Sequence, residues 1–431
     1  MKNVLTYLVL LVFVQNSFAQ NITLTGHVLK NSTKTPVMYA NVSIKGYPVG
    51  VSTNEIGEFS FHIPHNYYND TLLVSAIGYS TYECAIGELN NNDSLIIQLE
   101  EQIYELENVV VFPEDQLKGI IRNVTKNLKK NCPNHRYMLN GFYRELVLKD
   151  NSYTRLIEAA VDVQKPGFNS ESGDLVRVNE LRKSNSYIDY DWKSILMGKI
   201  VGEENYLLGI LGKDIVTNKK RSYSTKEVFK NDFIKNYDFV LENVSMIDSV
   251  RIFEIRFCHK KYYEEGRSDF SVMLNHWISV RENNFAVLKY VSKLQIVKEF
   301  DKSEIVNFED NCIDKHTVYY KEYEEKYYPY LFESTNLIIA KHANEETGEG
   351  KQYMKSTLLI NNILTKRSKY EKVKQKISSP KDLDLYNQEY KYHPEFWEHY
   401  NILQINPIFK QVKEDLEDEK TLEEQFIENG K

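Results

Sequence analysis

Short runs of alternating apolar and polar residues occupy the chain from residue 22 to residue 111. A period of two is typical of β-strands, because successive side chains point to opposite faces of a sheet. The alternating apolar positions are Ile22 and Leu24, then Ala40, Val42 and Ile44, then Phe59, Phe61 and Ile63, and continuous apolar runs follow at 72–76 and 95–99. Glycines separate these runs about every ten residues, which predicts seven or so strands in a β-sandwich over residues 21–112. Gly57 is expected to form the turn of a hairpin whose second strand buries Phe59 and Phe61.

The pattern changes after Pro113, where apolar residues recur at helical spacing between acidic residues and lysines. These apolar residues are Leu117, Ile120, Ile121, Val124 and Leu128. Strands are then predicted at 137–148, 153–163, 251–257, 273–280, 285–291, 318–323, 330–339 and 353–364, and a capping box at 224–227 predicts a second short helix. Residues 113–377 should therefore form an α+β domain on a large curved antiparallel sheet, and the apolar segment 378–431 should pack on that sheet. The predicted fold class is mainly β.

The first 20 residues have the layout of a secretory signal peptide. Lys2 precedes an apolar run from Val4 to Val14, and Ser17 and Ala19 supply the small residues that a signal peptidase recognises. The run is shorter than the roughly 20 residues that cross a bilayer as a helix. Cleavage is expected after Ala19 or Gln20, and a retained membrane anchor is the alternative.

Composition narrows the class of protein. The chain has 54 Lys and Arg against 61 Asp and Glu, a net charge of -7, so it has no global positive field for nucleic acid. Hydrophobic residues make up 42% and aromatic residues 13%, which indicates a folded, strand-rich chain.

The cysteines and histidines form no convincing metal or redox motif. No C-x-x-C pair occurs among the four cysteines, which are Cys84, Cys132, Cys258 and Cys312. They are expected either to form disulfides, whose pairing the sequence does not determine, or to be buried free thiols. The stretch from His342 to Glu345 matches the H-x-x-E of zinc carboxypeptidases, but chance alone explains so short a match. His62 and His65 near a strand end are expected to be surface residues. We therefore expect no metal site, no cofactor and no catalytic residue.

Two groups of residues are candidates for a functional site. Arg144, Glu145 and Glu158 lie on strands expected to pair, where two carboxylates could act on a glycosidic bond. A cross-strand ion pair explains the same residues structurally. Six tyrosines around a charged hairpin form a second candidate, a binding surface of exposed rings for a sugar or a protein partner, with packing in the sheet as the alternative. They are Tyr319, Tyr320, Tyr323, Tyr327, Tyr328 and Tyr330.

Four segments of the predicted sandwich carry a family resemblance: G-H-V at 26–28, T-P-V-M-Y-A-N-V-S-I at 35–44, G-V-S-T-N-E-I-G-E-F at 50–59 and S-A-I-G-Y at 75–79. They resemble the carboxypeptidase regulatory-like domain, a transthyretin-like sandwich, and the chain as a whole resembles secreted proteins that contain it. Residues 105–111 resemble the segment that follows this domain in TonB-dependent outer-membrane receptors. About 320 residues remain after it, too few for a receptor plug and barrel at about ten residues per strand plus loops.

The strands at 251–257, 273–280 and 284–288 are similar to lipoprotein-carrier-like half-barrels, which hold an apolar ligand on a concave sheet. The chain departs from that pattern at Leu274-Asn275-His276-Trp277, where the half-barrels usually have glycine and an aliphatic–aromatic pair.

These observations predict a non-enzymatic exported envelope protein that binds a protein, glycan or lipid partner. Its expected place is the periplasm or the outer membrane, with peripheral membrane association. The alternatives are a glycan- or peptide-directed hydrolase that uses paired acids, and a periplasmic carrier of acyl chains. The triplets at 70–72, 93–95 and 248–250 also resemble periplasmic O-glycosylation sites of the Asp-Ser/Thr-aliphatic type.

Overall fold

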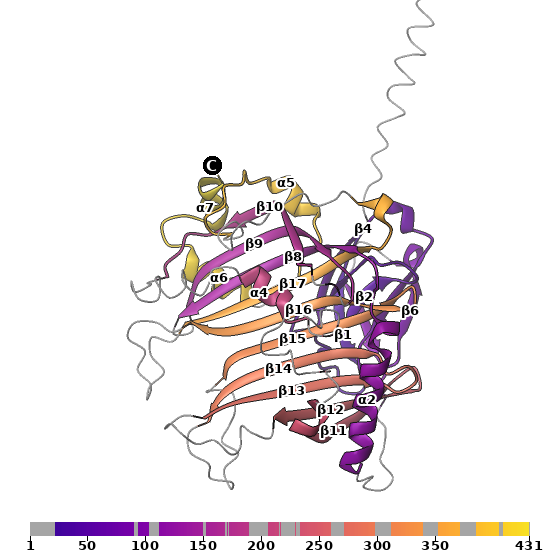
Figure 1. Cartoon of the computed structure of the whole chain (residues 1–431). Helices are drawn as coiled ribbons and strands as arrows, with labels where there is room; N and C mark the ends of the chain where they lie inside the picture. Colours follow the sequence, from indigo (N-terminus) through magenta and orange to yellow (C-terminus); the bar gives the residue numbers. More distant parts are fainter. Residues whose placement is uncertain are drawn as a thin grey trace, which may run out of the picture.

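The structure is a computed structural model that describes residues 22–89, 94–102, 112–149, 152–168, 170, 172–188, 206–214, 216, 229, 233–259, 271–297, 312–338, 352–370, 385–404 and 408–430. The predicted signal peptide, the capping box at 224–227 and the H-x-x-E match at 342–345 lie outside these residues. The described chain consists of a small two-sheet sandwich and a ten-stranded antiparallel sheet with few helices (Figure 1), which confirms the predicted fold class.

The sandwich has seven strands in two sheets of order β4-β1-β7 and β3-β2-β5-β6. Its elements are β1 (Ile22–Lys30), β2 (Asn41–Ile44), β3 (Gly50–Ser52), β4 (Glu58–Ile63), η1 (His65–Tyr67), β5 (Thr71–Ser75), β6 (Tyr82–Ala85), η2 (Ile86–Glu88) and β7 (Leu95–Leu99). Alternate residues of β4 are buried, as its period of two predicts, because one face of each sheet packs against the other.

Gly57 adopts a φ of +75° in the turn before β4, a conformation that glycine reaches without strain. The side-chain oxygen of Asn54 closes this turn by accepting hydrogen bonds from the backbone N–H groups of Ile56 and Glu58. The turn is confirmed, but the predicted hairpin is wrong. β3 and β4 belong to different sheets, so the turn connects the two layers.

The large sheet has the order β10-β9-β8-β17-β16-β15-β14-β13-β12-β11, and each neighbouring pair is antiparallel. Its strands are β8 (Tyr137–Lys149), β9 (Ser152–Lys165), β10 (Leu175–Lys183), β11 (Tyr237–Ile247), β12 (Val250–His259), β13 (Ser271–Arg281), β14 (Val287–Val297), β15 (Cys312–Tyr323), β16 (Lys326–Ile338) and β17 (Gln352–Leu364). The last strand, β17, inserts between β8 and β16 and so joins two meanders into one sheet. Most strand pairs contain a register shift, and such bulges bend a sheet.

One face of this sheet, here called the inner face, is covered by α2 (Glu114–Asn131) and α4 (Tyr206–Gly212). The apolar stripe predicted for α2 packs there, with Leu117, Ile121, Val124 and Leu128 buried in one core with Tyr143, Tyr290 and Phe332 of the sheet. The short helix η3 (Phe233–Asn236) leads into β11. No helix in the described ranges is long and apolar enough to cross a membrane.

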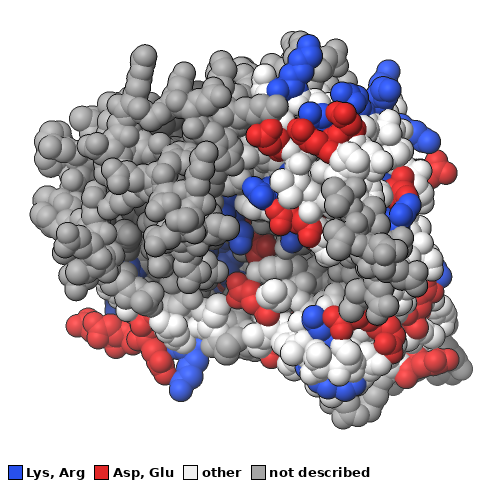
Figure 2. Space-filling view, turned by 90° about the horizontal axis from the view of Figure 1, so that it is seen from below, with Lys and Arg blue, Asp and Glu red and all other residues white. Residues whose placement is uncertain are grey.

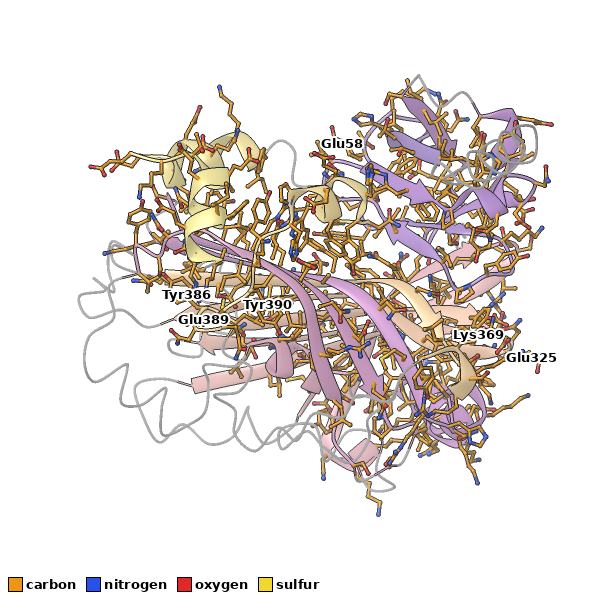
Figure 3. All side chains as sticks on the ribbon, turned by 90° about the horizontal axis from the view of Figure 1, so that it is seen from above. Glu58, Glu325, Lys369, Tyr386, Glu389 and Tyr390 are labelled. Atoms are coloured by element: carbon orange, nitrogen blue, oxygen red, sulfur yellow. The ribbon has the colours of Figure 1, made fainter. Side chains whose placement is uncertain are left out.

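The opposite, outer face carries the sandwich and the C-terminal segment, which lie on the same side of the sheet (Figure 3). Phe142, Leu331 and Leu359 of the sheet share a core with the sandwich and with Trp397. The segment contains α5 (Pro394–His399), α6 (Ile408–Leu416) and α7 (Leu422–Asn429), after η5 (Arg367–Lys369).

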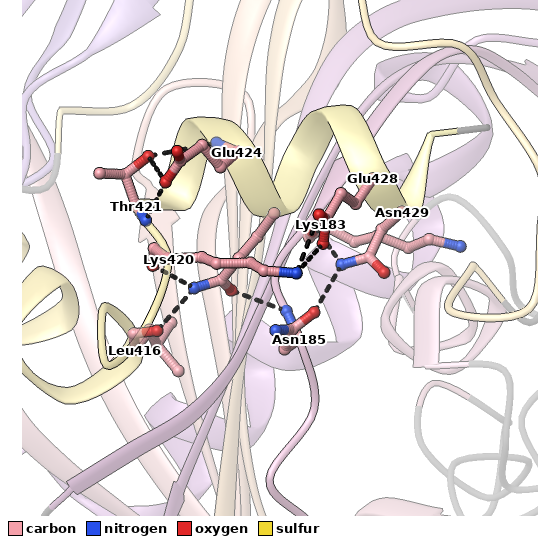
Figure 4. A network of polar contacts seen from close by, with 9 residues as sticks. Lys183, Asn185, Leu416, Lys420, Thr421, Glu424, Glu428 and Asn429 are labelled. Carbon is pink, nitrogen blue, oxygen red and sulfur yellow. Dashed lines mark hydrogen bonds and ion pairs between the residues drawn. The ribbon is translucent and has the colours of Figure 1, made fainter.

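Polar contacts fix α7 beside β10 (Figure 4). Thr421 forms a capping box with Glu424 at the start of the helix. The buried amide of Gln425 donates to the carbonyl oxygens of Leu416 at 2.7 Å and Lys420 at 2.9 Å, and its oxygen accepts from the backbone N–H of Asn185. The C-terminal segment is thus part of the folded body.

Candidate functional site

A cleft of about 930 Å³ lies between the sandwich and the outer face of the large sheet. The sandwich contributes one wall, which includes Met38, Tyr39 and Glu55, and β12 to β17 form the floor. The C-terminal segment near Leu403 borders one end. Seen from the β11 edge, the described surface is hollowed near its centre, and side chains of both charge signs lie around the hollow (Figure 2).

One row of register partners crosses the floor of the cleft. It runs from Trp277 on β13 through Val291, Thr317 and Glu333 to Thr357 on β17. Register partners stand side by side on one face of a sheet. Along this row the floor presents an indole ring, an aliphatic group, a hydroxyl, a carboxyl and a second hydroxyl, in that order.

Aromatic rings form the deep end of the cleft, where the sandwich meets the sheet. The ring of Tyr319 lies 5.8 Å from that of Tyr39 and 5.9 Å from that of Tyr330, and both pairs are tilted. The Tyr330 hydroxyl donates a 3.1 Å hydrogen bond to the carbonyl oxygen of Tyr39. The ammonium of Lys289 lies 5.3 Å from the centre of the Tyr319 ring, within cation–π range. These contacts fix the rings across the junction of the two domains.

Glu333 is the titratable group at the centre of this arrangement. Burial raises the pKa of its carboxyl to about 7, although hydrogen bonding with Tyr39 and the charges of Lys315 and Lys289 oppose the rise. A carboxyl with this pKa both donates and accepts hydrogen bonds near neutral pH. Perturbed carboxyls of this kind are typical of ligand and catalytic sites.

The structure separates the six tyrosines predicted as an exposed binding surface. Tyr320, Tyr327, Tyr328 and Tyr330 are buried, so the expectation of exposure is wrong for these four. The reason is that both faces of the sheet are covered. The Tyr320 hydroxyl donates to buried Asp214 at 2.9 Å, and the Tyr328 ring packs edge-on against Tyr137 in the inner core.

Tyr319 and Tyr330 lie on the outer face and line the cleft. A second cavity of about 640 Å³, between β2 and β5 of the sandwich and the β15–β16 hairpin, is lined by Tyr323, Tyr327 and Tyr330. The six residues thus divide between the inner core and two cavities at the domain junction.

Glu145 and Glu158 do not form a catalytic pair. Glu158 lies on the outer face opposite Arg144, its register partner, and Arg144 Nε donates to it at 2.6 Å. Glu145 lies on the inner face, where it pairs with Arg155 at 2.5 Å. Because the sheet separates the two carboxylates, the paired-acid hydrolase loses its proposed residues, and the cross-strand ion pair is the explanation that holds.

The remaining metal and redox candidates also stay apart. His62 Nδ1 lies 2.9 Å from the Thr23 hydroxyl, while His65 stacks on Tyr68 at 5.6 Å. Within the described ranges no three His, Cys, Asp or Glu side chains are placed to hold a metal ion. Cys84 and Cys132 are free thiols, Cys258 is buried, and the side chain of Cys312 is outside the described set.

Two features of the sequence, apart from the predicted site residues, point to the cleft. Glu333 directly follows the apolar residues Tyr330-Leu331-Phe332 within a strand, where an acid is costly unless it has a partner or a function. Lys289 and Lys293 of β14 are four residues apart and so lie on one face of the strand, which likewise marks that face as polar.

Comparisons with known proteins give one family match and several similar solved structures. Residues 24–111 match the family model of the CarboxypepD_reg-like domain, and the comparison with curated proteins gives no match. A solved lipoprotein-sorting protein domain from Vibrio parahaemolyticus is similar at 10% identity and a TM-score of 0.25, over 56% of this chain and 90% of that chain. A DUF1329 family protein from Desulfovibrio piger is similar at 7% identity and a TM-score of 0.21, over 59% of this chain and 98% of that one. A LolA superfamily protein from Nitrosomonas europaea is similar at 8% identity and a TM-score of 0.21, over 57% and 92% of the two chains.

These three likenesses are too low in score to carry a function. The family match agrees with the seven-stranded sandwich and with the sequence resemblance noted at 26–79. The N-terminal sandwich is therefore a CarboxypepD_reg-like domain.

Proposed function

We propose that this protein is an exported, non-enzymatic binding protein that holds a carbohydrate in the cleft between its sandwich and the outer face of its large sheet. The observation that carries the proposal is the cleft itself, about 930 Å³, whose walls come from both domains. Ligand sites in proteins are commonly concave and lie at domain junctions.

The lining chemistry favours a sugar over a purely apolar ligand. Sugar rings offer C–H faces that pack on flat aromatic rings and hydroxyls that need hydrogen-bond partners at the rim. Trp277 and Tyr319 supply such rings, while Thr317, Glu333 and Glu55 supply donors and acceptors beside them. An acyl chain would leave these polar groups desolvated without partners, which costs free energy.

The proposal can be tested by calorimetric titration of the purified protein with oligosaccharides, using maltohexaose, a chondroitin sulfate hexasaccharide and oligogalacturonate as probes. Replacing Trp277 by alanine should weaken binding about tenfold, because a stacked ring is lost. Tyr187, which is 47% exposed and lies outside the cleft lining, provides the matched aromatic control as Tyr187→Ala. The proposal fails if no oligosaccharide binds, or if both variants weaken binding equally. Release of new reducing ends from a probe would instead indicate a hydrolase.

Export to the periplasm or the outer membrane is part of the same proposal, since the first 20 residues have the layout of a signal peptide. N-terminal sequencing of the protein from fractionated cells should find a chain that begins at Gln20 or Asn21. An intact Met1 in the cytosolic fraction would contradict export.

A second candidate, an acyl-chain carrier, is favoured by one feature of the inner face. Ile278, Tyr290, Val318, Phe332 and Leu358 are consecutive register partners from β13 to β17 and form an apolar row. A carrier would place the acyl chain along this row after α4 moves away. A fluorescent fatty-acid probe measures this binding. Displacement of the probe by lipid, weaker probe binding to the Ile278→Asp variant and unchanged binding to the Trp277→Ala variant would favour the carrier.

A further inference from the structure

Three lysines lie in one row at the mouth of the cleft. Lys293 on β14 and Lys315 on β15 are direct register partners, and the row continues through Thr335 on β16 to Lys355 on β17. All four residues line the cleft. With neighbouring strands about 4.8 Å apart, the row extends over roughly 15 Å of the outer face.

Within the described chain, no carboxylate pairs with the positive charges of Lys315 and Lys355 in this row. Like charges placed directly opposite each other destabilise a strand pair. Neither Lys315 nor Lys355 has a described carboxylate within 4.0 Å, and both side chains are exposed at the cleft mouth. Lys289 lies deeper, beside the Tyr319 ring, and also lacks a described carboxylate at that distance.

The acids of the cleft cancel these charges only in part, since the lining has five lysines and one arginine against Glu55, Glu254 and Glu333. Glu333 is two residues from Thr335 on β16, but its raised pKa of about 7 leaves it partly protonated at neutral pH. Burial also lowers the pKa of Lys289, which indicates a site where an added negative charge would stabilise the ammonium form. The cleft lining therefore has more cationic than acidic side chains, with Lys315 and Lys355 at its mouth and aromatic rings in its interior.

We propose, on the basis of the carbohydrate-binding function above, that the ligand is an anionic oligosaccharide whose sulfate, phosphate or carboxylate groups contact Lys315 and Lys355 while a sugar ring packs on Trp277. Lysine presents a compact charge with several rotatable donors, so the row accepts any of these groups without demanding one geometry. The distance between Lys315 and Lys355, two strands apart, is about 10 Å and suits charges on neighbouring sugar residues.

The test compares the double variant Lys315→Gln/Lys355→Gln with Lys126→Gln/Lys129→Gln, an equal charge change on exposed positions of α2, on the other face of the sheet. Calorimetry measures the affinity of each full-length protein for a chondroitin sulfate hexasaccharide, oligogalacturonate and maltohexaose. The cleft variant should bind the two anionic probes about tenfold more weakly, and the α2 variant should stay within about twofold of the parent. Added salt should weaken the parent's binding to the anionic probes and leave maltohexaose unchanged.

The outcomes separate this inference from the function on which it rests. If maltohexaose binds as tightly as the charged probes and the cleft variant changes nothing, the anionic preference is wrong while carbohydrate binding survives. If no oligosaccharide binds, both proposals fail. Tighter binding of polyglutamate than of any oligosaccharide would overturn the sugar assignment in favour of an acidic peptide. Binding to inorganic phosphate alone would overturn the sugar assignment in favour of a free anion. Binding to phosphatidylcholine vesicles only when they contain phosphatidylglycerol would overturn it in favour of a lipid headgroup.

Discussion

Replacing Glu158 by glutamine should destabilise the protein strongly, because this buried carboxylate is the shared acid partner of two arginines. Glu158 is 1% exposed and accepts hydrogen bonds from Arg144 Nε and Arg182 Nε, both at 2.6 Å. Arg144 is itself buried and also donates to the carbonyl oxygen of Leu403 at 2.8 Å. The Arg182 guanidinium lies 4.4 Å from the centre of the Trp397 ring. The site therefore connects the sheet to the C-terminal segment.

The magnitude follows from what the substitution leaves behind. Glutamine keeps the shape but removes the charge, so two guanidiniums stay in a desolvated site with no described carboxylate to neutralise Arg144. Removal of one member of a buried ion pair costs about 3–5 kcal/mol. Burial opposes ionisation of Glu158, yet the two arginines hold the pKa of its carboxyl below the ordinary value. Its contribution is thus fully present above the pKa of the unfolded chain and is lost as the pH falls through the lower, folded-state pKa.

Urea unfolding, followed by far-ultraviolet circular dichroism and by tryptophan fluorescence, measures the effect. Glu158→Gln should lower the midpoint well below that of the parent at pH 7, and the difference should shrink on acidification. Glu428→Gln serves as the control. It removes the exposed ion pair between Glu428 on α7 and Lys420 before the helix, and it should leave the midpoint unchanged. Equal midpoints for the two variants would refute the idea that Glu158 neutralises a buried site.

Three further changes have effects set by single contacts. Glu333→Gln should raise the free energy of unfolding by up to about 3 kcal/mol at pH 8 and by little at pH 4. The reason is that the parent loses stability as the pH rises from the ordinary carboxyl pKa to the folded-state pKa of about 7. Urea unfolding at both pH values checks this. Gly57→Ala should lower the free energy of unfolding by about 1–3 kcal/mol, which thermal unfolding would show as a lower midpoint. The φ of +75° is unfavourable to alanine, and the added Cβ would lie 2.5 Å from the carbonyl oxygen of Val28. Thr421→Ala should cost about 1 kcal/mol by removing the capping box with Glu424; hydrogen exchange should then speed up in α7 but not in α2.

The sandwich could be predicted from the sequence because several of its strands, such as β1, β4 and β5, alternate buried and more exposed residues. β4 shows this directly, with every second residue buried. β8 and β9 are buried on both faces, so their sequences predict strands without saying which side chains face which layer. The same ambiguity made Tyr320 and Tyr328 look exposed.

The cleft could not be located from the sequence because its lining combines positions as distant as Lys30 and Ile408. Strand order decides which residues meet, and the decisive pairing of β17 with β8 joins segments about 200 residues apart. Local patterns carry no information about that pairing. They do mark Glu333 and Lys315 as charged residues on strands, and the topology then places those strands side by side.

A single cross-strand row explains why one part of the outer face packs and another part is available for a ligand. The row that holds Glu333 continues through Thr357 and Arg144 to Glu158 and Arg182. At the β8–β10 end, Glu158 lies between two arginines, so every charge has an opposite partner, and the C-terminal segment covers this site. At the β14–β16 end, Glu333 has no described cation within 4.0 Å, and neither Lys289 nor Lys315 has a described carboxylate at that distance. Desolvation of unbalanced charge is costly, so this end stays open between the two domains, where a ligand of complementary charge would complete it.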